Sequence, residues 1–150
     1  MLTAKQQKSV RLILGVLELI VAVAALPAGW ALMQDPTGAV RGLEVDALRG
    51  SEFTDFYIPG LVLFALNGLG MLGGALASFA HWKYAGTLGI ILGAGLVLWI
   101  LIQVSTVGLT SFLQAIFLGI GMVIAGIGWW IRKFKTPTAQ EQEENSRPFF

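Results

Sequence analysis

Three glycines in the segment LNGLGMLGGA, residues 66–75, have the G-x-G-x-x-G spacing of a loop that binds dinucleotide phosphates. They are Gly68, Gly70 and Gly73. Such a loop follows a strand, opens a helix and has an acidic residue about 20 positions later. Here the glycines lie inside an uncharged apolar segment, and residues 85–104 contain no carboxylate. The spacing therefore does not predict a dinucleotide site, and close packing of membrane helices explains the glycines better.

Four polar side chains interrupt the apolar segments: Glu18, Asn67, Gln103 and Gln114. A charged carboxylate at the depth of Glu18 is costly in a membrane, so we expect this side chain to be protonated or to reach Arg11 through water. Two interpretations of the four side chains stay open. They form a polar line that carries a proton or a solute, or they hydrogen-bond between helices and contribute about 1 kcal/mol each.

The chain lacks the residues that several other kinds of functional site need. The chain has no cysteine and one histidine, His81, which excludes thiol chemistry, cysteine-held zinc or iron–sulfur centres and sites of several histidines. A formal net charge of +1 gives no reason to expect nucleic acid. No nucleophile–base pair is recognisable, so we expect no enzyme, cofactor or metal. The carboxylates between the first two apolar segments match no cation-binding loop: Asp35, Glu44, Asp46, Glu52 and Asp55.

The polar residues must be positioned by membrane helices. The chain is 55% hydrophobic and 13% charged, whereas ordinary globular chains are about a quarter charged. No charge occurs at residues 58–80 or 84–131, and about 18 apolar residues suffice for a helix to cross the bilayer. We predict an all-α polytopic membrane protein of four antiparallel transmembrane helices, at about residues 12–33, 58–80, 84–105 and 112–131. Ser111 and Gln114 have the S-x-x-Q spacing of a capping box that starts the fourth helix.

Basic residues in the short connections predict the orientation. They precede the first span, separate the second from the third and follow the fourth: Lys5, Lys8, Arg11, Lys83, Arg132, Lys133 and Lys135. By the positive-inside rule, both termini face the cytoplasm and the loop at residues 34–57 faces outward. Residues 39–48 of that loop have the apolar spacing of a short surface helix. The transmembrane domain covers residues 1–135, and the polar residues 136–150 form a disordered cytoplasmic tail.

Small residues recur along each predicted span. Fifteen of the nineteen glycines fall inside the spans, mostly at steps of three or four that place them on one helix face. Glycine lets two helix backbones approach closely in lipid, so these faces predict a tight bundle or a contact with another protein. The residues assigned to this packing are Gly15, Gly70, Gly74, Gly89, Gly93 and Gly121.

Two segments resemble small four-span bacterial membrane proteins. They are FTDFYIPGL at residues 53–61 and WILIQ at residues 99–103, and the resemblance covers roughly residues 50–114. It implies a four-helix bundle in the bacterial inner membrane and brings no activity or functional residue with it.

Two functional classes fit these features. In the first, the protein is a non-enzymatic accessory subunit that packs against other membrane proteins or copies of itself through its glycine faces or its tail. In the second, it is a small proton-coupled transporter or carrier with Glu18 as the titrating group. The lipid bilayer is the partner common to both.

Overall fold

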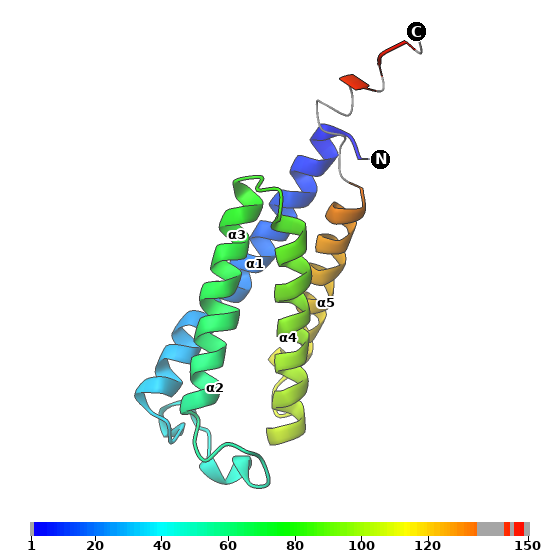
Figure 1. The fold of residues 1–150 in the computed structure, drawn as a ribbon. Coiled ribbons are helices and arrows are strands. Elements are labelled where there is room, and N and C mark those ends of the chain that lie inside the picture. The colour runs from blue at the N-terminus through cyan, green and yellow to red at the C-terminus, as the bar shows by residue number, and fades with distance from the viewer. Residues whose placement is uncertain (1, 135–142, 145, 149–150) are drawn as a thin grey trace.

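The computed structural model describes residues 2–134, 143–144 and 146–148, and every regular element in them is helical. Helix α1 spans Ala4–Gln34. The second long helix consists of α2 (Tyr57–Val62), the π-helical segment η3 (Leu63–Gly70) and α3 (Met71–Phe79). Helices α4 (Ala85–Val107) and α5 (Phe112–Lys133) follow. The predicted all-α fold of four antiparallel helices is confirmed (Figure 1).

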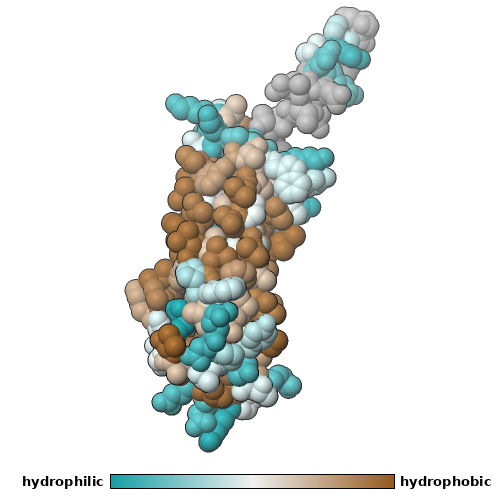
Figure 2. All heavy atoms as spheres, turned by 90° about the vertical axis from the view of Figure 1, so that its left-hand side faces the viewer, coloured by the Kyte–Doolittle hydropathy of each residue, from teal (hydrophilic) through white to brown (hydrophobic). Residues whose placement is uncertain are grey.

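All four helices are long and apolar enough to cross a membrane. Figure 2 shows hydrophobic side chains over the middle of the molecule and hydrophilic ones toward its two ends. We call the end that carries residues 35–56 the loop end, and the opposite one the terminal end. At the terminal end Gln7 Nε2 donates a hydrogen bond to the Phe134 carbonyl, which joins the start of α1 to the end of α5. The chain thus has the architecture of an integral membrane protein.

Capping residues explain where the helices begin relative to the apolar segments of the sequence. Helix α1 begins well before the apolar run because Thr3 and Gln6 form a capping box at its start. The capping box predicted at Ser111 and Gln114 is present at the start of α5. The predicted tail, residues 136–150, lies outside the described residues except for 143–144 and 146–148.

The prediction of one surface helix over residues 39–48 is wrong. The loop instead forms two short 3-10 turns, η1 (Ala39–Arg41) and η2 (Val45–Leu48). Gly42 separates them with φ 68°, a left-handed conformation that cannot continue a helix. Hydrogen bonds from the Thr37 hydroxyl and the Val40 amide hold the pKa of the Asp35 carboxyl below its usual range. These bonds fix the start of the loop.

Helices α4 and α5 pack closely against each other. A Cβ atom placed on Gly93 would lie 2.5 Å from the backbone nitrogen of Ala125, and one on Gly128 would lie 2.6 Å from the Gly86 carbonyl oxygen. Backbones that approach this closely leave no room for a side chain. The six glycines assigned to packing all lie against another helix of this chain: Gly15, Gly70, Gly74, Gly89, Gly93 and Gly121. Their faces therefore point into the bundle.

We expect Gly93→Ala to destabilise the protein by about 1–3 kcal/mol, because the added methyl group meets the α5 backbone. Gly119→Ala is the matched control. Gly119 also lies in a transmembrane helix but has nothing within 4 Å of the added atom. This change should leave the free energy of unfolding unchanged or raise it by up to about 1 kcal/mol. Denaturant unfolding of both variants in detergent checks the expectation, and equal effects would contradict it.

Candidate functional site

Glu18 lies in the core between α1 and α3. Its side chain is fully buried, and Oε2 accepts a hydrogen bond of 2.9 Å from the hydroxyl of Ser78, which is itself buried. A Cβ atom on Gly74 would lie 2.8 Å from Oε1, so this glycine makes the room that the carboxyl group occupies. Arg11 instead donates to the Trp82 carbonyl oxygen at 2.9 Å. In this structure Glu18 connects two helices through a hydrogen bond.

A cavity of about 470 Å³ lies nearer the loop end, between α1, the α2–η3 segment, α4 and the start of α5. Its α1 wall is made of Val21, Ala24, Ala25, Ala28 and Leu32. The three alanines leave space that larger side chains would fill. Apolar side chains from the segment between α1 and α2 form a cover over the cavity. They are Leu48, Phe53 and Phe56, which pack with Leu32.

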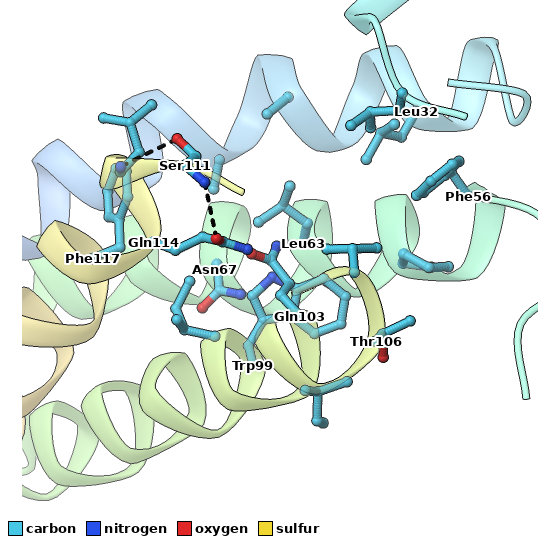
Figure 3. Close-up of a pocket in the computed structure, with 18 of the residues that line it drawn as sticks. Leu32, Phe56, Leu63, Asn67, Trp99, Gln103, Thr106, Ser111, Gln114 and Phe117 are labelled. Carbon is cyan, nitrogen blue, oxygen red and sulfur yellow. Dashed lines mark hydrogen bonds between the residues drawn. The ribbon is translucent and has the colours of Figure 1, made fainter. Parts of the chain in front are cut away.

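Two other walls carry polar side chains. Asn67 enters from η3, where the π-helical turn interrupts the α-helical register, a local change that is frequent at functional sites. Trp99, Gln103 and Thr106 follow one another on α4 at steps of four and three, which places them on one face. Figure 3 shows Asn67, Trp99, Gln103 and Gln114 gathered around the same space from three helices. The cavity is therefore apolar on the side of α1 and partly polar on the side of α4 and α5.

Two residues of the cavity lining, Asn67 and Trp99, carry three unpaired polar atoms. Both side-chain amide atoms of Asn67 and Nε1 of Trp99 are buried and have no hydrogen-bond partner among the described residues. Asn67 is fully buried and Trp99 is 5% exposed. Buried polar groups in proteins are nearly always paired, and each unpaired one costs about 1–3 kcal/mol. Because both residues line one cavity, this cavity is the candidate functional site.

Gln114 also borders the cavity, but its hydrogen bonds are satisfied. Its Oε1 accepts from the backbone amides of Thr110 and Ser111, and its Nε2 donates to the Gly108 carbonyl oxygen. Gln114 thus fixes the turn between α4 and α5 beside the cavity. The side chain is a structural cap.

The structure divides the four polar residues predicted from the sequence into two groups. Asn67, Gln103 and Gln114 line the same cavity, whereas Glu18 is absent from its lining. Arg41, which is exposed, is the single charged residue in the described lining.

Neither Trp99 nor the apolar walls of the cavity were predicted from the sequence. The signal for Trp99 was its position four residues before Gln103, which places both on one helix face. A comparison with family models, curated proteins and solved structures found no match to this chain. The role of the cavity therefore has to be argued from its own geometry.

Ser78→Ala should destabilise the protein by about 1–3 kcal/mol, because Glu18 would lose the hydrogen bond from Ser78. The matched control is Ser105→Ala, in which the exposed hydroxyl group bonds only to the carbonyl of its own helix turn. Unfolding midpoints in detergent check the difference. A Ser78 variant as stable as the control would show that this hydrogen bond contributes nothing.

Asn67→Leu should raise the stability of the ligand-free protein by about 1 kcal/mol, because it removes two unpaired buried atoms and keeps a similar volume. Gln114→Leu should lower it, because three hydrogen bonds at the start of α5 are lost. Thermal unfolding of both variants tests the contrast. If Asn67→Leu is also destabilising, the amide is already paired in the protein.

Proposed function

We propose that this integral membrane protein is non-enzymatic and binds a small amphipathic molecule in the cavity at the loop end. The observation that carries the proposal is the presence of three buried, unpaired polar atoms on Asn67 and Trp99, two residues that line a mostly apolar cavity. Ligand sites are commonly apolar pockets of about 300–1,000 Å³ with a few polar groups that orient the ligand. The volume of 470 Å³ falls in that range.

Exposed residues support access of a ligand to the cavity. Arg41, Thr110 and Leu113 all line it and are all exposed. We further propose that the loop end faces away from the cytoplasm and that the membrane is a bacterial inner membrane. The distribution of the basic residues supports this orientation. The ligand then enters from the outer leaflet or from the outer aqueous phase.

A cavity-filling variant tests the binding proposal. Ala28 lines the cavity, so Ala28→Phe should abolish saturable binding of the fluorescent probe N-phenyl-1-naphthylamine to the protein in lipid nanodiscs. Ala94→Phe is the control, because Ala94 lies exposed on α4 and is not among the residues lining the cavity. This variant should bind the probe like the original protein. Absence of saturable binding to the original protein, or equal binding to the Ala28 variant, would overturn the proposal.

An accessory-subunit role is a second proposal, and one feature of α5 favours it. Gly119 and Gly126 lie away from the bundle and have nothing within 4 Å of an added Cβ atom. Small residues on a lipid-facing surface allow a second helix to approach closely. The mass of the complex extracted gently from its native membrane tests this role, with Gly119→Leu and Gly126→Leu as variants. A monomer in the native extract would count against it.

The contacts of Glu18 argue against the proton-coupled carrier. A carrier needs a titrating group that a proton can reach from one side of the membrane. Glu18 is fully buried, is bonded to Ser78 and is not among the residues that line the cavity. We therefore propose a structural role for its carboxyl group, of which Oε2 is paired and Oε1 is buried without a partner among the described residues.

A further inference from the structure

We infer that the molecule bound in the cavity is an uncharged amphiphile whose head group both donates and accepts hydrogen bonds, such as a primary amide or an alcohol. The head group would lie between Asn67 and Trp99, with its hydrocarbon tail along the alanines of α1. This inference rests on the proposed binding function and specifies the class of ligand.

The unpaired atoms determine the hydrogen-bonding pattern. Trp99 Nε1 and Asn67 Nδ2 are donors, and Asn67 Oδ1 is an acceptor. A ligand atom that only accepts, such as an ester oxygen, would leave the Asn67 oxygen unpaired. A hydroxyl or amide group supplies an acceptor and a donor together, so it can satisfy all three atoms with one functional group.

The residues that line the cavity also determine which charge on the ligand is favourable. The described lining contains no acidic residue, and its one basic residue, Arg41, lies exposed in the loop. The other polar side chains of the described lining, among them Trp99 and Gln103, are neutral. A charged head group there would be desolvated without a counter-charge, which is much more costly than burying a neutral polar group.

The shape accommodates a linear tail. The α1 wall runs from Val21 to Leu32, which is about 16 Å at a rise of about 1.5 Å per residue. An extended chain advances about 1.2 Å per bond, so a tail of about ten carbons fits along this wall. Ala24, Ala25 and Ala28 present small apolar surfaces over that length.

Competition with N-phenyl-1-naphthylamine in nanodiscs tests the inference with four ten-carbon competitors, each corrected for its partitioning into lipid. They are decanamide, 1-decanol, methyl decanoate and decanoate at pH 8. Decanamide and decanol should compete about tenfold more strongly than methyl decanoate, which only accepts hydrogen bonds, because the ester leaves a buried atom unpaired. Decanoate should compete at least as weakly as the ester, because it is charged and offers no donor.

Variants at Asn67 and Trp99 locate the head group. In Asn67→Leu the ratio of the inhibition constants of methyl decanoate and decanamide should fall toward one, whereas Ala94→Phe should keep the original ratio. Trp99→Phe removes a single donor and should weaken decanamide and methyl decanoate alike. Two results would overturn the inference about the ligand class: equal competition by all four compounds, or an unchanged ratio in Asn67→Leu. Saturable probe binding in the same experiments would still support the proposed binding function. If the probe does not bind at all, the proposed function itself fails.

Discussion

The fold depends on the close approach of helix backbones in a medium that offers no hydrophobic drive for their association. Helices α4 and α5 meet at Gly93 and Gly128 with no room for a side chain between them. Helix α1 meets the second long helix in the same way, since a Cβ atom on Gly29 would lie 2.5 Å from the backbone nitrogen of Phe64. The bundle thus consists of two closely packed pairs, and the space left between the pairs at the loop end becomes the cavity.

The buried polar groups differ in whether their hydrogen bonds are satisfied. Ser78 donates a hydrogen bond to Oε2 of Glu18 across α1 and α3, while Oε1 of Glu18 is buried without a partner among the described residues. Gln114 bonds to the backbone that precedes α5. These groups stabilise the helix arrangement. Asn67 and Trp99 have no such partners, although an apolar residue in either place would avoid the cost of the unpaired atoms. Stability alone does not explain their chemistry, which is why binding is the better explanation.

Hydropathy and charge were sufficient to predict the four helices, because each span must satisfy its own backbone hydrogen bonds in lipid. The S-x-x-Q spacing was sufficient for the cap at Gln114, because a capping box is a contact within one turn. The cavity could not be predicted in this way. It depends on the distance between helix pairs, on the π-helical turn that carries Asn67, and on a loop whose apolar residues fold back onto Leu32. None of these features is encoded in a local pattern.

The position of the cavity follows from how small residues are used along α1. Toward the terminal end, Gly15 lies against the Phe79 ring, and the helices close around it without leaving space. Toward the loop end, Ala24 and Ala28 instead line the cavity. A small residue of α1 therefore allows close packing where a partner helix approaches it and lines a cavity where none does. The cavity is covered by the apolar residues of the loop rather than by a transmembrane helix.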